Sequence, residues 1–280
     1  GYPDLEYIVI DGGSTDESVE IIRKYEPWLA YWVSEKDRGQ SHAINKGLER
    51  CTGVFFNWIN SDDLLLEGAL ATVALNSEGA DCVVGWNVVR RAGSQDRLVK
   101  PGGYTWSAFV CRNEQFVYEQ PSTWMLACRL RSCGGLRSDY HYMFDYEMMV
   151  RFLYPQAKVT HVALPLSLFR IYETSKTGSQ RVRFREELYD IWGGFLHDDR
   201  YAAFHTTICR RRRKLMHWIR RTRRKREWEA FLASRRLFGP IPAAKVLALA
   251  LLDPTIRLRR SAGTLSYMLR CLRLTRRTGR

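Results

Sequence analysis

The chain has 280 residues, of which 45% are hydrophobic and 12% aromatic, so it can bury a core and does not have a disordered composition. Its net charge of +14 is unevenly distributed, because residues 200–280 hold 23 Lys and Arg against three Asp and Glu. No apolar run reaches the 18 residues of a membrane-spanning helix. The seven cysteines form no CxxC pair, which disfavours a disulfide framework or a cysteine zinc site and favours a reducing compartment.

Strands and helices are predicted to alternate over the first 90 residues. Apolar, β-rich runs predict strands at 5–10, 29–34, 54–59 and 81–86. Apolar residues at helical spacing predict helices over 16–26, around 43–48 and over 67–77. This alternation is typical of an α/β fold whose successive strands pair in parallel through right-handed crossovers.

The second half of the chain has a less regular pattern. A helix is predicted from Asp145 to Tyr154, and strand signals return at 158–170. After about residue 178 the sequence becomes helical and basic. We therefore expect two parts, a folded domain over 1–199 and a basic amphipathic helical tail over 200–280.

Acidic side chains follow three of the predicted strands. Asp11 follows the first strand, Asp37 and Arg38 the second, and Asp62 and Asp63 the third. The carboxyl ends of parallel strands meet at one edge of a sheet, where ligands bind. A divalent cation such as Mg²⁺ or Mn²⁺, carrying a diphosphate, would compensate these carboxylates. The alternative is that each acid caps a helix or lies solvated in a loop.

Several other classes of site lack their signatures in this sequence. It has no GxGxxG or Walker A motif, which disfavours a Rossmann dinucleotide site and a P-loop. It also has no HExxH pair and no GxSxG motif, which disfavours a zinc hydrolase and a serine hydrolase.

Five segments together resemble the family 2 glycosyltransferases of the GT-A fold. They are YIVIDGGSTDES at 7–18, SEKDRGQSHAINKGL at 34–48, FFNWINSDDLL at 55–65, QPSTWMLACRLRSCGGL at 120–136 and MFDYEMMVRFL at 143–153. The resemblance covers about residues 1–178 and implies a GT-A-type, Rossmann-like, mostly parallel sheet flanked by helices. It also implies an inverting sugar transfer from a nucleotide-diphosphate donor, such as a UDP- or GDP-sugar, in the synthesis of cell-envelope polysaccharides.

The resemblance implies roles for the strand-end residues. Asp11 would contact the nucleotide base or ribose, and Asp37 and Arg38 would line the donor pocket. Asp62 would face the ribose or the donor sugar. Asp63 would be the direct ligand of Mn²⁺ or Mg²⁺, in a metal motif that reads SDD here.

In the later segments, the resemblance places Asp145 at the position of the catalytic base. An inverting transfer needs one carboxylate to take the proton of the acceptor hydroxyl, and Glu147 is the competing residue. Gln120 would lie near the donor sugar or the acceptor. Arg170 would belong to a loop that closes over the diphosphate, or else would be a structural ion-pair partner.

Family members begin with a further strand and helix, so the resemblance implies that the chain as given is truncated at its N-terminus. A second hypothesis follows from this, namely an inactive relative that acts only as a basic membrane- or nucleic-acid-binding protein. A nucleotidyltransferase is a third, which the DRGQS and FDYE segments disfavour.

The basic tail predicts a partner of opposite charge. Arg-rich helical segments with interleaved Trp and Leu suit an anionic membrane surface. We therefore expect a peripheral protein at the cytoplasmic, inner face of the membrane that acts on a glycan or lipid-linked acceptor. Nucleic acid is the rival partner, although no recognition signature supports specific binding. A solvated charge run is the remaining alternative.

Overall fold

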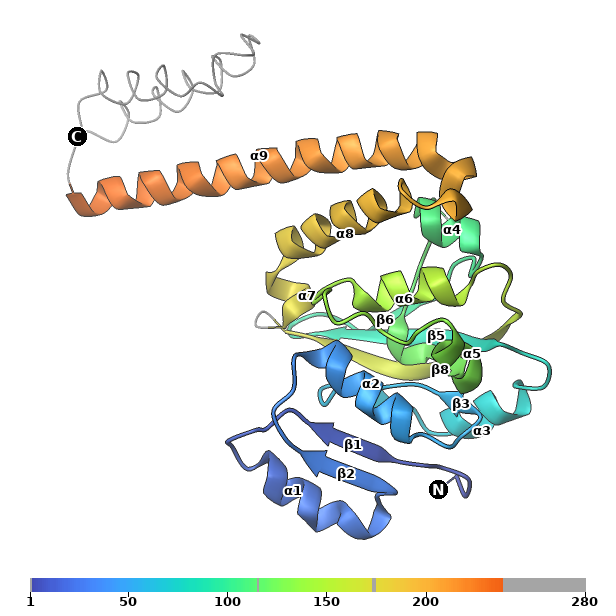
Figure 1. The fold of residues 1–280 in the computed structure, drawn as a ribbon. Helices are drawn as coiled ribbons and strands as arrows, with labels where there is room; N and C mark the ends of the chain where they lie inside the picture. The colour runs from blue at the N-terminus through green and yellow to red at the C-terminus, as the bar shows by residue number, and fades with distance from the viewer. Residues whose placement is uncertain (1, 115, 173–174, 239–280) are drawn as a thin grey trace. The chain divides into compact units, whose positions relative to one another are not determined.

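The computed structural model describes residues 2–114, 116–172 and 175–238 (Figure 1). The chain divides into two compact units, residues 1–220 and 221–280. The boundary predicted at 199/200 falls inside the first unit. The tail predicted for 200–280 is described only as far as Phe238, and its remainder lies outside the described residues.

The N-terminal segment forms a two-stranded parallel sheet. β1 (Ile8–Asp11) pairs with β2 (Tyr31–Ser34), and the connection contains α1 (Ser18–Tyr25) and the 3-10 turn η1 (Glu26–Trp28). The register places Asp11 opposite Ser34 at the carboxyl ends of both strands. α2 (Gln40–Arg50) follows β2 and contacts β1. The first two predicted strands and their parallel pairing are confirmed.

A second sheet forms the centre of the unit. In spatial order its strands are β3 (Phe55–Phe56), β7 (Thr123–Leu126), β5 (Cys82–Arg91), β8 (Val159–Ile171) and β4 (Leu64–Leu65), with β6 (Arg97–Val99) paired to β5. β5 and β8 run in parallel, and the other pairs of this sheet are antiparallel.

The expectation that the first four strands pair in one parallel sheet is wrong: β1 and β2 form a sheet of their own, and the third and fourth predicted strands lie in the central sheet, separated by β7. The predicted strand 54–59 is reduced to Phe55–Phe56, which pairs antiparallel with β7. Beyond Phe56, side chains replace the backbone ladder: Asn57 Nδ2 donates to the carbonyl of Pro121 at 2.9 Å, and Gln120 Nε2 donates to the carbonyl of Trp58 at 2.7 Å. The mixed α/β class is nonetheless the predicted one.

Helices cover the central sheet (Figure 1). The remaining elements are α3 (Ala69–Leu75), α4 (Trp106–Cys111), η2 (Gln120–Ser122), α5 (Ala127–Ser132), α6 (Phe144–Phe152), α7 (Lys176–Ser179), α8 (Arg181–Phe195), η3 (Asp199–Phe204) and α9 (His205–Phe238). α6 is the core helix, because Met148, Met149, Val150 and Phe152 have no exposed surface. Burying such side chains stabilises the fold by about 1.5–3 kcal/mol each.

The same helix carries Asp145, the candidate base of the sequence analysis, in its first turn. The predicted helix over 145–154 and the predicted strand at 158–170 are confirmed as α6 and β8. Among the described residues, no helix is both long and apolar enough to cross a bilayer.

Candidate active site

Asp11 lies at the carboxyl end of β1 and accepts several hydrogen bonds. Its Oδ2 accepts from the backbone N–H of Gly13 at 3.1 Å, from that of Ser14 at 2.9 Å and from Ser34 Oγ at 2.6 Å. Its Oδ1 accepts from Ser14 Oγ at 2.5 Å. The hydroxyls of Ser14 and Ser34, followed by the backbone N–H groups, lower the pKa of Asp11 to about 2. The carboxylate is therefore charged and fixed at physiological pH.

The loop after β2 lies directly against the loop after β1. A Cβ built on Gly12 would lie 2.7 Å from Asp37 Oδ2, so a larger residue at this position would force the Asp37 side chain to move. Asp37 Oδ1 accepts from the backbone N–H of Gly39 at 2.7 Å. Gly39 precedes α2 with a φ of +112°, a conformation open to glycine. Arg38 is exposed beside them.

Side-chain hydrogen bonds join the loop after β2 to the loop that contains Asp62 and Asp63. Gln40 opens α2, and its Nε2 donates to Asn60 Oδ1 at 2.5 Å. Asn60 Nδ2 in turn donates to Asp63 Oδ2 at 3.0 Å. From the segment after β8, Lys176 Nζ donates to Gln40 Oε1 at 3.2 Å. A cation of the predicted closing loop therefore lies beside the strand-end loops.

Asp62 and Asp63 differ in their surroundings. Asp63 is buried, and its second oxygen, Oδ1, accepts the backbone N–H of Arg170 at 3.2 Å. Burial raises the pKa of Asp63, although the hydrogen bonds from Asn60 and Arg170 lower it. Asp62 is partly exposed, and its backbone carbonyl accepts from the guanidinium of Arg170. Asp63 thus holds the loop to β8, whereas Asp62 has the more accessible carboxylate.

Gln120 connects the QPS turn to the end of β3. It is buried, and besides the bond to Trp58 its Nε2 donates to Asn57 Oδ1 at 3.0 Å. The amide thus has partners within the protein, and its role here is to hold the loop that leads to Asp62. Trp124 of β7 is partly buried and packs against a cluster of buried apolar side chains that includes Val73, Val83 and Leu166.

Asp145 lies in the first turn of α6, where the helix dipole favours an ionised carboxylate. Its Oδ1 accepts the backbone N–H of Tyr146 at 2.7 Å. Burial raises the pKa of Asp145 to about 6, while this hydrogen bond and the nearby Arg112 guanidinium act in the opposite direction. A carboxylate with a pKa near 6 is ionised at neutral pH and is a stronger base than an ordinary aspartate.

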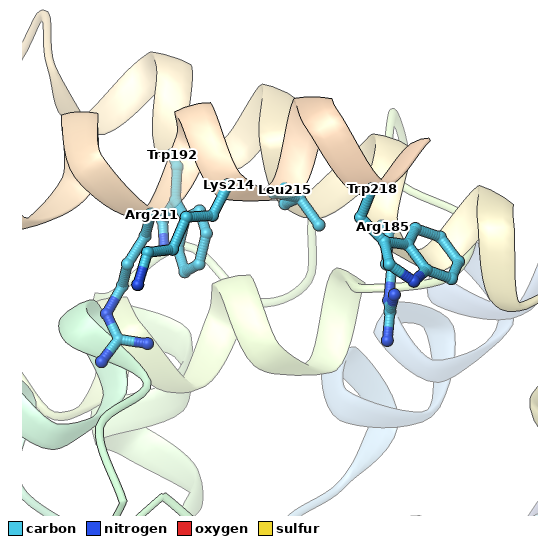
Figure 2. A pocket seen from close by; sticks show the side chains of 6 residues that line it. All are labelled: Arg185, Trp192, Arg211, Lys214, Leu215 and Trp218. Atoms are coloured by element: carbon cyan, nitrogen blue, oxygen red, sulfur yellow. The ribbon is translucent and has the colours of Figure 1, made fainter. Parts of the chain in front are cut away.

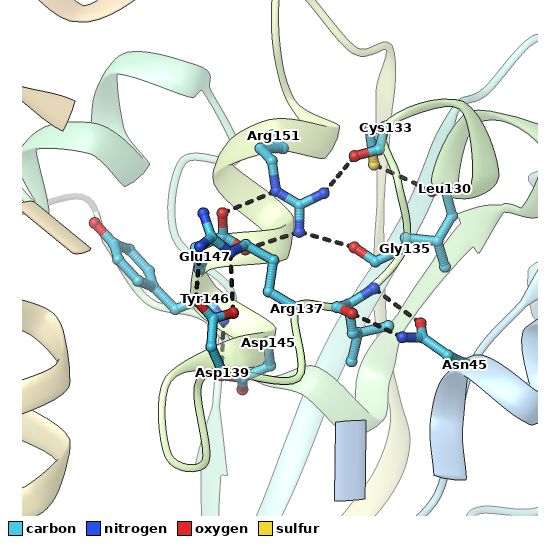
Figure 3. Close-up of polar contacts among 11 residues, drawn as sticks. Asn45, Leu130, Cys133, Gly135, Arg137, Asp139, Asp145, Tyr146, Glu147 and Arg151 are labelled. Carbon is cyan, nitrogen blue, oxygen red and sulfur yellow. Dashed lines mark hydrogen bonds and ion pairs between the residues drawn. The ribbon is translucent and has the colours of Figure 1, made fainter. Parts of the chain in front are cut away.

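Glu147, the competing residue, is occupied by an ion pair (Figure 3). Arg151 Nε donates to Glu147 Oε1 at 2.8 Å, and Arg151 Nη2 donates to Glu147 Oε2 at 2.7 Å. The same guanidinium donates to the carbonyls of Cys133 and Gly135. Glu147 is buried with this arginine and serves to anchor the Gly134-Gly135 turn on α6.

The same turn is held from the other side by α2. Asn45 Nδ2 donates to the carbonyl of Leu136 at 2.7 Å, and Asn45 Oδ1 accepts the N–H of Leu136 at 2.9 Å (Figure 3). A Cβ on Gly135 would lie 2.8 Å from Asn45 Oδ1. These contacts fix α2, which carries the donor-pocket loop at its start, relative to α6, which carries Asp145.

Glu187 of α8 holds the segment that leads into α6. Its Oε1 accepts the N–H of His141 at 2.8 Å, and its Oε2 accepts those of Tyr142 at 2.7 Å and Met143 at 2.9 Å. His141 also lies against the second loop, because a Cβ on Gly39 would be 3.6 Å from its Nδ1. His141 therefore lies between the loop after β2 and the segment that leads to Asp145.

The chemistry of these residues suits a divalent cation that binds together with a diphosphate. In the part of the chain that the structure describes, no group of three or more His, Cys, Asp and Glu side chains is arranged to hold a metal. A nucleoside diphosphate would supply further oxygen ligands, so fewer side chains suffice. Asp62 and Asp63 offer hard oxygen atoms, and an adjacent cation would offset the burial cost of the Asp63 charge.

The structure thus joins the predicted residues into two groups. Asp11, Asp37, Asp62, Asp63 and Arg170 belong to one set of contacting loops, and Asp145 lies beyond His141. Sequence patterns did not indicate Asn45 or Glu187, which is one of three acids in a helix that also holds three arginines. Ser34 could have been noticed, since it ends a strand as Asp11 does.

Residues 1–133 match the family described as Glycosyl transferase family 2. An uncharacterized glycosyltransferase of Mycobacterium tuberculosis is 31% identical over 151 residues, which are 52% of this chain and 56% of the relative. A PGL/p-HBAD biosynthesis glycosyltransferase of Mycobacterium bovis is 34% identical over 94 residues, 31% of this chain and 37% of the relative. The match thus spans about half of the first relative's length, and less of the second.

Solved structures share the fold at low sequence identity. The Staphylococcus aureus protein TarS, residues 1–349 in complex with UDP-GlcNAc, has a TM-score of 0.54 and 15% identity, covering 68% of this chain and 57% of that one. The mannosyltransferase PcManGT of Pyrobaculum calidifontis, in complex with GDP-Man and Mn²⁺, has a TM-score of 0.53 and 18% identity, covering 89% of this chain and 72% of that one.

The described fold is the GT-A fold of glycosyltransferases. The family match over residues 1–133 covers just under half of the chain. The elements that contain Asp145 and Arg170 lie beyond the matched residues.

Proposed function

We propose that the chain is an inverting glycosyltransferase that uses a nucleotide-diphosphate sugar and a divalent cation. The observation that carries the proposal is Asp145, a partly buried carboxylate in the first turn of α6 with its pKa raised to about 6. A base of this kind takes the proton of the acceptor hydroxyl as that oxygen attacks the anomeric carbon. Attack from the face opposite the diphosphate gives inversion. Glu147 is unavailable, because Arg151 occupies both of its oxygens.

The strand-end loops form the donor site in this proposal. Asp11, fixed by Ser14 and Ser34, is assigned to the nucleoside, and Asp37 and Arg38 line the same pocket. Mn²⁺ or Mg²⁺ at the Asp62–Asp63 pair would stabilise the departing diphosphate as a Lewis acid when bound. Arg170 and Lys176, which contact these loops, add positive charge for the same diphosphate. The UDP-GlcNAc and GDP-Man complexes of the similar structures support a donor of this class.

The acceptor and the location follow from the charge of the C-terminal region. We assign a glycan or lipid-linked acceptor and a peripheral position at the cytoplasmic, inner face of an anionic membrane. The described part of α9 supports this assignment, because its residues Arg210–Lys214 are five consecutive cations.

Turnover of a donor panel tests the proposal. UDP- and GDP-sugars are incubated with Mn²⁺ and candidate glycan and lipid acceptors, and product is followed by mass spectrometry, with the anomeric configuration read by NMR. We expect transfer with inversion, lost on chelation of the metal. Asp145→Asn should lower kcat roughly 10²–10⁴-fold, whereas the control Asp139→Asn, an exposed residue of the preceding loop, should not.

Three results would contradict the proposal. They are retention of configuration, metal-independent transfer, and full activity of Asp145→Asn. A folded chain that turns over no donor and binds no nucleotide would support the second hypothesis, a basic binding protein without catalytic activity.

A further inference from the structure

The groove between α8 and α9 combines positive charge with an aromatic floor. Within residues 1–220, a cavity of about 250 Å³ is lined by Arg185 and Trp192 of α8 and by Arg211, Lys214, Leu215 and Trp218 of α9 (Figure 2). It is open to solvent and lies away from the strand-end loops. It contains none of the residues assigned above to transfer.

The positive charges of the groove are not neutralised by the protein. The six lining residues include three cations and no carboxylate. Among the described residues, none of the three forms an ion pair. Uncompensated cations in a partly desolvated groove attract an anion more strongly than cations that are surrounded by water.

Two of these cations are also held in place. The guanidinium of Arg185 lies over the ring of Trp218, 3.4 Å from its centroid, and burial lowers the pKa of Arg185, as does the nearby Arg181. Arg211 donates from Nη1 to the carbonyl of Arg112 at 3.0 Å, while its Nε is buried without a hydrogen-bond partner in the described part of the chain. Preorganised guanidinium groups of this kind recognise phosphate oxygens.

The floor of the groove is apolar. Trp192 is almost fully buried, and its Nε1 donates to the carbonyl of Val110 and to Tyr146 Oη, both at 3.2 Å. Its polar atom is therefore satisfied inside the protein, and its ring is left as an apolar surface. Leu215 and Trp218 are partly exposed beside it. A ligand that fits must carry an anionic group together with apolar carbon.

We propose that the α8–α9 groove binds the phosphate headgroup of an anionic membrane lipid. A phospholipid supplies both features, with the phosphate on Arg185, Arg211 and Lys214 and the glycerol ester over Trp218 and Leu215. The cavity has room for a headgroup, at roughly 30 Å³ for each water-sized volume, but not for a whole lipid. The acyl chains therefore stay in the bilayer. This site rests on the proposed membrane location and gives that location a defined lipid contact.

Two charge-reversal variants in α9 distinguish binding in the groove from general electrostatic attraction to the membrane. Lys214 and its neighbour Arg213 are both exposed, but only Lys214 lines the groove. Flotation of the full chain is measured with two kinds of vesicle, one of phosphatidylcholine alone and one that also contains phosphatidylglycerol. Each basic side chain near an anionic surface strengthens binding roughly fivefold. We expect Lys214→Glu to weaken binding to the anionic vesicles at least severalfold more than Arg213→Glu does.

A further variant tests the apolar floor of the groove, and two control measurements check that this variant is folded. Trp218→Ala should also weaken flotation with anionic vesicles, while circular dichroism and nucleotide affinity stay as in the wild type. Inorganic phosphate should compete weakly if at all, because it lacks the apolar part.

Three outcomes would each overturn a part of this proposal. Wild-type flotation with equal loss in Lys214→Glu and Arg213→Glu would overturn the groove site and leave general charge attraction. Competition by inorganic phosphate at the strength of lipid would overturn the lipid assignment. No flotation of the wild-type chain would overturn the membrane location together with the groove.

Discussion

Glu187 of α8 accepts the backbone N–H of Met143 at 2.9 Å, and Met143 is the residue that precedes α6, two positions before Asp145. The same carboxylate accepts the N–H groups of His141 and Tyr142. Three donors on one carboxylate define the course of the segment that enters α6. The position of the proposed base is therefore set by a residue outside its own motif.

The first prediction concerns this contact. Glu187→Ala leaves three N–H groups without their acceptor, which costs about 1–3 kcal/mol for each donor that stays buried and unpaired. We expect a lower melting temperature and a fall in kcat that exceeds any change in KM for the donor, because the donor loops are held by other contacts. Glu187→Gln, which keeps one carbonyl oxygen, should recover part of both losses.

Asp190→Asn is the matched control, since Asp190 is an exposed acid on the same helix. It should change neither the melting temperature nor kcat. A kcat for Glu187→Ala equal to that of the wild type would show that the segment does not position Asp145.

The second prediction concerns the pH dependence of Asp145. Its folded-state pKa of about 6 lies above the ordinary value of 3.8, so the folded protein favours the protonated form. Transfer requires the ionised form, so kcat should rise with pH through about 6 and level off above it. The effect on stability has the opposite sign, because the ionised Asp145 carboxylate destabilises the folded state. Asp145→Asn should therefore stabilise the protein at pH 7 by on the order of 2 kcal/mol, and this gain should fade as the pH falls below 6.

Denaturant unfolding at pH 7 and pH 4 measures the stability effect, and initial rates over pH 5–8 measure the activity effect. A variant that is destabilised at pH 7 would show that the Asp145 carboxylate is not penalised by burial.

The third prediction concerns Asp11, whose pKa of about 2 lies below the ordinary value. Its hydrogen bonds contribute stability that is present above pH 4 and is lost as the pH falls through 2. After allowance for solvent screening, Asp11→Asn should destabilise the protein at pH 7 by about 1 kcal/mol. The exposed Asp4→Asn serves as control. An unchanged free energy of unfolding for Asp11→Asn would contradict the charged network seen around Ser14 and Ser34.

The fourth prediction separates the two acids of the third loop. Asp63 is buried between Asn60 and the backbone of Arg170, so Asp63→Ala should lower the melting temperature. Asp62 is more accessible and its carbonyl, rather than its carboxylate, binds Arg170, so Asp62→Ala should leave the melting temperature unchanged while reducing Mn²⁺-dependent nucleotide binding. Thermal melts with and without nucleotide distinguish the two. Equal melting temperatures for both variants would contradict this division of roles.

Much of the fold could be predicted because its signals are local. The apolar run at 81–86 predicts the start of β5, and the apolar residues at helical spacing around Met148 and Phe152 predict α6. The course of the third strand could not be predicted. It depends on Gln120 and Asn57, which are more than 60 residues apart in sequence and replace the backbone ladder by side-chain hydrogen bonds.

The candidate site shows the same division. The acids at the strand ends could be located from the pattern alone, because each follows an apolar, β-rich run. The difference between Asp62 and Asp63 could not be predicted from the pattern, because it depends on which of the two adjacent carboxylates faces β8. The occupation of Glu147 by Arg151 is an i, i+4 pair that the sequence allows but does not distinguish from a solvated pair.

Binding of nucleotide tests the central claim most directly, because it needs neither the donor sugar nor the acceptor to be known. UDP and then GDP are titrated calorimetrically into the full chain with and without Mn²⁺, beside Asp62→Ala, Asp63→Ala and the control Asp139→Asn. We expect binding of one nucleotide that requires Mn²⁺, is weakened in Asp62→Ala and is kept in Asp139→Asn. Binding of neither nucleotide by the folded chain, or binding that is indifferent to Mn²⁺ and to both acids, would contradict it.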